Sequence, residues 1–136
     1  MKNMSFSATW PQILESWERV RRGEAPTKDL TRRMKCNLKP GERFQAVRKQ
    51  RGLKKGEHVE RGPELVCVSN EVERLDTIAF RPCRMGMPSK SEVAREGFPD
   101  MNNWEFIEMF ARLNRGCNLG TMIHRVEFKY IVEGGA

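Results

Sequence analysis

The chain has 136 residues, a length typical of a single domain, and its 25 lysine and arginine residues outnumber 18 acids to give a net charge of +7. No apolar run approaches the roughly 18 residues that a membrane helix needs, and the first residues lack the apolar core of a secretion signal. We therefore expect a single domain over residues 1–132, a flexible end over residues 133–136, a cytoplasmic location and no membrane partner.

Four cysteines are spread along the chain without the spacing of a metal site. Cys36, Cys67, Cys83 and Cys117 form no C-x-x-C pair, and no H-x-x-x-H motif is present. This spacing predicts free thiols and no structural zinc. The phosphate-binding, dinucleotide-binding and common hydrolase motifs are also absent from the sequence, so no cofactor is expected.

The positive charge is concentrated between Arg19 and Arg61. This segment holds fifteen lysine and arginine residues against five acids, a net +10, so the remainder of the chain is net acidic. Such asymmetry favours a polyanionic partner, such as RNA or single-stranded nucleic acid, over a neutral small molecule. A basic run of this kind is also compatible with a merely solvated face, because no aromatic residues interleave with it to form a base-stacking platform.

The first half of the chain predicts one helix between extended segments. Residues 4–9 alternate as a strand does, and apolar residues at helical spacing predict a helix from Pro11 to about Gly23. Residues 27–33 are expected to be a short extended or irregular segment. A Pro-Gly turn then leads into a strand over residues 43–48.

The second half predicts two more strands and two more helices. A basic loop over residues 51–57 precedes the most strongly β-branched segment, residues 64–69. A short helix over residues 92–96 is expected to stop at Gly97, and the composition of residues 122–131 is that of a strand. The mixture, without repeated βαβ spacing, predicts an α+β domain with a small, mostly antiparallel sheet or barrel.

A helix starting at Asn102 or Asn103 is predicted to place Trp104 on its apolar face. Trp17 has similar helical spacing, so both tryptophans are interpreted as core residues. Trp10 follows the first extended segment, and its position leaves open whether it faces a cleft.

Seven segments, taken in order, resemble the ASCH family, the activating signal cointegrator homology domains, in its short bacterial and phage form. The segments are Met4–Ser7, Pro11–Leu14, Lys28–Arg33, Leu38–Arg43, Gly52–Glu57, Val93–Phe98 and Val126–Tyr130. The resemblance covers nearly the whole chain. It implies a PUA-like small β-barrel with flanking helices and a basic cleft for RNA, a nucleotide or a modified nucleoside.

Some members of that family are acetylcytidine amidohydrolases that use a lysine, a threonine and a glutamate. Matched residue by residue, the K-x-x-T pair falls on Lys28 and Thr31, and the glutamate of the short helix falls on Glu96. A threonine hydroxyl becomes a nucleophile when a base removes its proton, and a lysine can be that base when burial or nearby cations lower its pKa. Glu96 would then orient the lysine or carry a proton to the leaving amine.

Three classes of function therefore stay open. They are a domain that binds nucleic acid or a modified nucleoside, an amidohydrolase of acylated cytidine-type nucleosides, and a protein-interaction module with an acidic partner. The candidate nucleic-acid contacts are Arg32, Arg33, Lys49, Arg51, Lys54 and Lys55. The sequence does not predict an oligomeric state.

Overall fold

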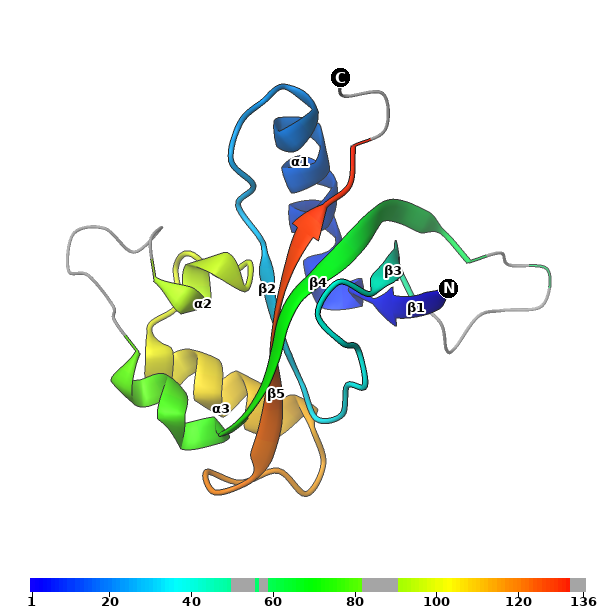
Figure 1. Ribbon diagram of the computed structural model, residues 1–136. Coiled ribbons are helices and arrows are strands. Elements are labelled where there is room, and N and C mark those ends of the chain that lie inside the picture. Colours follow the sequence, from blue (N-terminus) through cyan, green and yellow to red (C-terminus); the bar gives the residue numbers. More distant parts are fainter. Residues whose placement is uncertain (50–55, 57–58, 82–90, 133–136) are drawn as a thin grey trace.

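The computed structural model describes residues 1–49, 56, 59–81 and 91–132. Its centre is a five-stranded sheet that curls into a half-barrel (Figure 1). The strands are β1 (Lys2–Ser5), β2 (Leu30–Arg33), β3 (Arg43–Val47), β4 (Arg61–Arg74) and β5 (Met122–Tyr130), in the order β1-β3-β4-β5-β2. The β1–β3 pair is parallel and the other pairs are antiparallel. Because β1 and β2 stand at the two ends of the strand order, they are the two open edges of the sheet.

Helical segments lie at two ends of this sheet (Figure 1). They are the 3₁₀ turn η1 (Ser7–Thr9), α1 (Trp10–Arg21), the 3₁₀ segment η2 (Leu75–Phe80), α2 (Glu92–Arg95) and α3 (Asn103–Leu113). No helix within the described residues is both long and apolar enough to cross a membrane. The α+β mixture expected from the sequence is confirmed in this coarse form.

Most predicted elements are present, with two differences near the N-terminus. The strand predicted over residues 4–9 is β1 only up to Ser5, and its second half turns into η1. Residues 30–33, expected to be extended or irregular, form a regular strand because they pair with β5 from Leu30 opposite Glu127 to Arg33 opposite His124. Both differences depend on strand partners that are distant in the sequence.

The hydrophobic core has two parts. Inside the curl, Phe6, Trp10 and Phe128 belong to one buried cluster, whereas Ile107 and Ile123 belong to a second cluster beneath η2 and α3. Trp10 is therefore a core residue, and it packs so closely on Gly62 that a Cβ at that glycine would lie 2.5 Å from the indole ring. The close approach of strand to ring requires glycine there.

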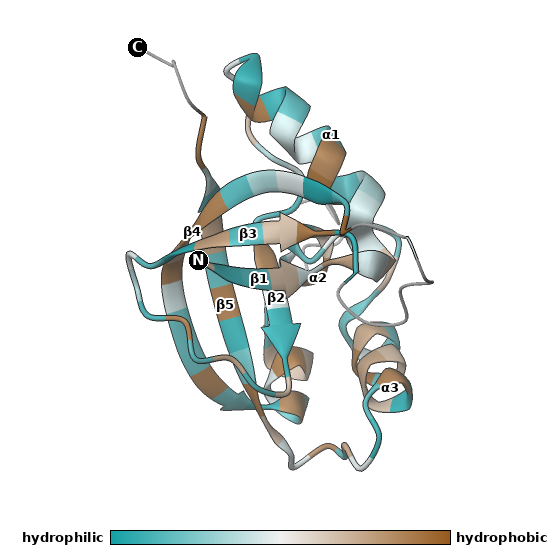
Figure 2. Ribbon diagram, turned by 90° about the vertical axis from the view of Figure 1, so that its right-hand side faces the viewer, coloured by the Kyte–Doolittle hydropathy of each residue, from teal (hydrophilic) through white to brown (hydrophobic). Residues whose placement is uncertain are grey.

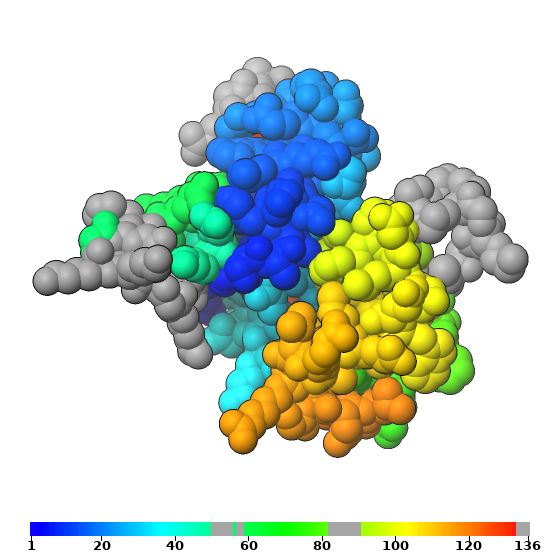
Figure 3. Space-filling view, turned by 180° about the vertical axis from the view of Figure 1, so that it is seen from behind, coloured from blue at the N-terminus to red at the C-terminus, as the bar shows by residue number. Residues whose placement is uncertain are grey.

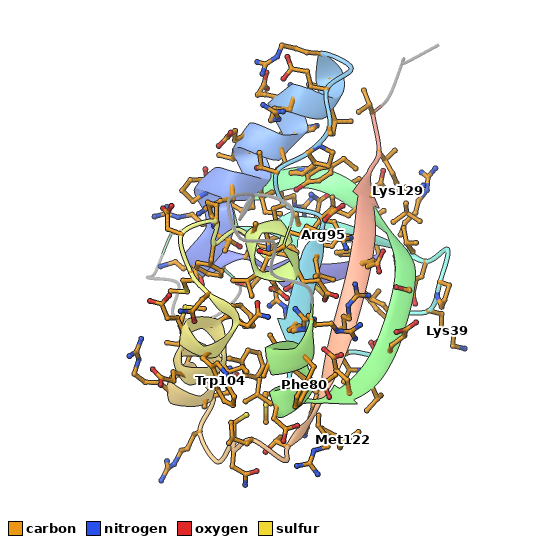
Figure 4. All side chains as sticks on the ribbon, turned by 90° about the vertical axis from the view of Figure 1, so that its left-hand side faces the viewer. Lys39, Phe80, Arg95, Trp104, Met122 and Lys129 are labelled. Carbon is orange, nitrogen blue, oxygen red and sulfur yellow. The ribbon has the colours of Figure 1, made fainter. Side chains whose placement is uncertain are left out.

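The prediction for Trp104 is wrong. A capping box between Asn102 and Glu105 starts α3 as expected, and Phe106, Ile107 and Phe110 then form its buried stripe. Trp104 lies about 110° around the helix from the middle of that stripe, at 100° per residue, and its surface is 53% exposed (Figure 4). Trp17 is partly buried against the first core cluster.

Strand β2 is largely hydrophilic in composition (Figure 2), yet its first three residues are buried. Because side chains alternate along a strand, Leu30 and Arg32 share one face of the sheet, while Thr31 and Arg33 share the other. The first pair faces α2, where Arg32 bonds Glu92 and Glu96. On the second face, Arg33 lies over the ring of Phe6, the residue that precedes η1. This alternation determines the geometry of the candidate site.

Candidate active site

A cavity of about 310 Å³ lies where β2, the η1 turn, the end of α2 and α3 meet; it is called the central cavity below. In Figure 3 the N-terminal segment (blue) borders the α2–α3 region (yellow to orange), and the residues after β2 (cyan) lie below it. Phe6, Phe98, Phe106 and Phe110 contribute aromatic walls to the cavity. Small-molecule sites commonly combine such walls with a few polar groups.

The three residues Lys28, Thr31 and Glu96 all line the central cavity, and each is less than 5% exposed. They come from the loop before β2, from β2 itself and from the end of α2. The fold thus brings together groups that are up to 68 positions apart in the sequence.

Lys28 is a fully buried cation. Its Nζ donates hydrogen bonds to the backbone oxygen of Leu30, at 2.8 Å, and to the backbone oxygen of Glu96. Burial lowers the pKa of Lys28 to about 8, since desolvation disfavours the charged amine more than the nearby Glu96 favours it. A substantial fraction of Lys28 is therefore neutral in mildly alkaline solution, and a neutral amine can accept a proton.

Two side chains from separate elements fix the backbone of Lys28. Ser16, buried on α1, accepts hydrogen bonds at its Oγ from the backbone nitrogens of Thr27, at 3.0 Å, and Lys28, at 2.9 Å. Tyr130, at the end of β5, donates its hydroxyl to the backbone oxygen of Lys28 at 2.7 Å. These bonds hold the loop before β2 against helix and sheet, so the amine occupies a defined position.

Thr31 is bonded in a way that suits a nucleophile. Its Oγ1 accepts a hydrogen bond from Nε of Arg33 at 3.1 Å. Because the arginine occupies an acceptor position of the oxygen, the hydroxyl proton stays free to be donated to a base. The neighbouring positive charge also stabilises an oxygen that is losing its proton.

Glu96 sits at the end of α2 with its carboxylate against a cation. Its Oε1 accepts from Arg32 at 3.2 Å. Burial raises the pKa of Glu96, although the charges of Lys28, Arg32 and Arg33 act in the opposite direction. The next residue, Gly97, has φ of +108°, and a Cβ there would lie 3.2 Å from Thr9 and 3.5 Å from the Lys28 side chain. Glycine is thus required for the end of α2 to reach the cavity.

Arg32 is completely buried and joins three carboxylates. Its guanidinium binds Glu73 on β4, at 2.9 Å, Glu92 on α2 and Glu96, the residue that follows α2. Arg125 on β5 reaches Glu92 as well, at 2.9 Å. This network fixes α2, and with it Glu96, against the sheet.

The candidate nucleic-acid contacts occupy different environments. Arg32 is enclosed by carboxylates, so contact with a phosphate would require those ion pairs to open. Arg33 is half-buried at the cavity, and Lys49 is half-buried beside a second cavity near β1. The other three candidates, Arg51, Lys54 and Lys55, lie outside the described residues.

Sequence reasoning missed the residues that position the site. The sequence patterns predict Ser16 and Tyr130 only as parts of a helix and a strand, and Glu92 only as a residue of the short helix. A polar serine on the inner side of an otherwise apolar helix face was the available signal for Ser16. Nothing local to Tyr130 or Glu92 predicts their partners, which are distant in the sequence.

The described residues contain no group of three His, Cys, Asp or Glu side chains arranged to hold a metal ion. Cys36, Cys67 and Cys117 are free thiols, and Cys83 lies outside the described residues. Comparison with known proteins found no matching family model, no matching curated protein and no matching solved structure.

Proposed function

We propose that this protein is a PUA-like domain of the ASCH type that binds a nucleoside or nucleotide in the central cavity. The observation that carries the proposal is the convergence of buried Lys28, Thr31 and Glu96 on one cavity with aromatic walls. Its volume of about 310 Å³ falls at the lower end of the range of about 300–1,000 Å³ for small-molecule sites. A nucleobase, which has apolar faces and polar edges, suits this combination of surfaces.

A second candidate, hydrolysis of an acylated cytidine-type nucleoside, is favoured by the lowered pKa of Lys28. With a value of about 8, a substantial fraction of the amine is neutral in mildly alkaline solution and can take the hydroxyl proton of Thr31. The threonine oxygen then attacks the acyl carbon, the bond from that carbon to the exocyclic nitrogen breaks, and a proton passes to the leaving amine. Water subsequently hydrolyses the acyl-threonine ester and frees the acid.

In this reaction Glu96 would serve the proton transfer to the leaving nitrogen. Burial raises the pKa of its carboxyl group, so it holds a proton more readily than an exposed glutamate does. Arg33 would stabilise the threonine oxygen through its hydrogen bond. Each role uses a group that lines the cavity.

The test has two parts, binding and turnover, with a panel of free and acylated nucleosides. Calorimetry should detect binding by the wild type, and Thr31→Val should weaken it. Thr77→Val is the matched control, because Thr77 lies on η2 and does not line the cavity. Chromatography of acetylcytidine incubated with the protein should detect cytidine if the domain is catalytic.

The outcomes separate the two candidates. Binding without turnover would leave a binding domain and remove the hydrolase. Turnover that survives Thr31→Val would remove threonine as the nucleophile. Absence of binding for every nucleoside and nucleotide tested would contradict the proposal as a whole.

A further inference from the structure

A second cavity, of about 530 Å³, adjoins the central cavity and is called the basic slot below. It lies between β1 and residues 33–38, the last residue of β2 and the five residues after it. Since β1 and β2 are the two open edges of the half-barrel, the basic slot lies where the sheet does not close on itself. The two cavities share Ser5, Ser7 and Arg33 as wall residues, so they lie next to each other at these residues.

The basic slot is lined by four cationic side chains and by no aspartate or glutamate among the described residues. The cations are Lys2, Arg33, Lys35 and Lys49. Lys2 is paired with Glu42 outside the slot at 3.0 Å. Lys35 is exposed and, in the described part of the chain, no carboxylate lies within ion-pair distance of it. Such a concave cluster of one sign attracts anions.

Arg33 connects the basic slot to the central cavity. Its guanidinium lies 4.9 Å from the ring centroid of Phe6, and its Nε is engaged by Thr31. No described carboxylate pairs with it, unlike Arg32 next to it. Desolvation lowers the pKa of Arg33, which records the cost of holding this cation away from water. An anionic ligand would relieve that cost, and arginine binds phosphate oxygens well because its terminal nitrogens form two parallel hydrogen bonds.

We propose that the basic slot binds a phosphate group of a nucleotide or short oligonucleotide whose base occupies the central cavity. This inference rests on the proposed function and narrows its ligand class from nucleosides and nucleotides to phosphorylated nucleosides alone. Arg33 contacts the phosphate at the junction of the two cavities, and Lys35 and Lys49 add charge along the slot.

The test compares the affinity of cytidine with those of cytidine 3′- and 5′-monophosphate and of a short single-stranded oligocytidylate. Two new charge-assisted hydrogen bonds should make the preferred monophosphate bind about tenfold tighter or more. The double variant Lys35→Gln/Lys49→Gln should lower that ratio by roughly threefold, because Arg33 still contacts the phosphate, and should leave cytidine binding unchanged. If the oligocytidylate bound tighter than cytidine and neither monophosphate did, the phosphate in the slot would be one of an oligonucleotide.

Lys129→Gln is the matched control for a lost positive charge. Lys129 is exposed on β5 (Figure 4) and lines neither cavity. It should leave the affinity ratio between monophosphate and nucleoside as in the wild type. A ratio that falls equally in this variant would show a general charge effect and would overturn the assignment to the slot.

Other results contradict the inference in distinguishable ways. Equal affinity for cytidine and all its phosphorylated forms would remove the slot as a phosphate site and leave the proposed function standing. A ratio of monophosphate to nucleoside affinity that stays at the wild-type value in the double variant would also remove the slot as a phosphate site. Competition by polyglutamate as strong as that by oligocytidylate would show an acidic protein as the partner of the slot. Failure to bind any nucleoside or nucleotide would contradict the proposed function as well.

Discussion

Two consecutive arginines of β2 have opposite surroundings. Arg32 is enclosed by three carboxylates from β4 and α2, whereas Arg33, on the other face of the sheet, is stacked on Phe6 without a described carboxylate partner. Both are partly or fully withdrawn from water. The comparison shows that the same residue type, one position apart, serves structure on one face and is available to a ligand on the other.

The difference follows from the alternation of side chains and from what covers each face. Helix α2 brings Glu92 and Glu96 over the face of Arg32, and Arg125 on the neighbouring strand joins the same network. The opposite face receives the uncharged η1 turn, followed by the open edge of the sheet. Arg32 therefore holds the site together, and Arg33 lies between its two cavities.

The largest expected effect distinguishes the two arginines by stability. Arg32→Leu leaves three carboxylates without their shared cation and should lower the free energy of unfolding by about 3–5 kcal/mol. Arg33→Leu removes a cation that has no described carboxylate partner and should change the free energy of unfolding by less than about 1 kcal/mol. Urea denaturation of both variants measures the contrast. Equal losses would show that the ion network contributes nothing particular to the fold.

The next prediction concerns the pH dependence of stability caused by Lys28. Its pKa is about 8 in the folded protein and 10.5 in an ordinary environment. Between these values the unfolded chain binds more protons, so the free energy of unfolding should rise with pH as the buried amine loses its charge. In the variant Lys28→Met this rise should be missing. The difference between variant and wild type should then change by about 2 kcal/mol from pH 7.5 to 9.5.

The measurement is denaturation at several pH values, all of them below the pH at which Tyr130 begins to affect stability. Burial raises the pKa of Tyr130, so the unfolded chain loses that proton first and stability falls above about pH 10. The nearby charges of Glu96, Arg33, Asp29 and Arg32 also act on the pKa of Lys28, and all four residues remain in the variant. Parallel stability profiles for variant and wild type would contradict the lowered pKa of Lys28.

The smallest effect compares two glycines of similar backbone conformation. Gly97 has φ of +108° and would place a Cβ against Thr9 and Lys28, whereas Gly116 has φ of +80° with nothing within 4 Å. Gly116→Ala should lower the free energy of unfolding by about 1 kcal/mol through backbone strain alone. Gly97→Ala should lower it by about 1–2 kcal/mol more than Gly116→Ala does. Thermal denaturation of each variant gives the comparison. If the two variants lose the same free energy of unfolding, the end of α2 is less tightly packed on Lys28 than the structure indicates.

Local patterns were sufficient for much of the fold. Apolar spacing located α1 and α3, the glycine after Glu96 marked the end of α2, and β-branched residues located β4 and β5. Local patterns failed where contacts with another part of the chain decide whether a segment is a strand or whether a side chain is buried. The Leu30–Arg33 segment became a strand through pairing with β5, and Trp104 was left outside because the buried stripe of α3 is centred on other residues.

The sequence by itself determined which residue types are available to the site and roughly which elements carry them. Lys28, Thr31 and Glu96 were identified through a resemblance in motif order, without knowledge of their separation in space. Only the tertiary structure decided that they line one cavity and that Ser16 and Tyr130 fix the backbone of Lys28. It also decided that Arg32 is enclosed by carboxylates while Arg33 lies over Phe6. The physical reason is that burial, pKa and ion pairing depend on neighbours from distant strands and helices, which local periodicity does not encode.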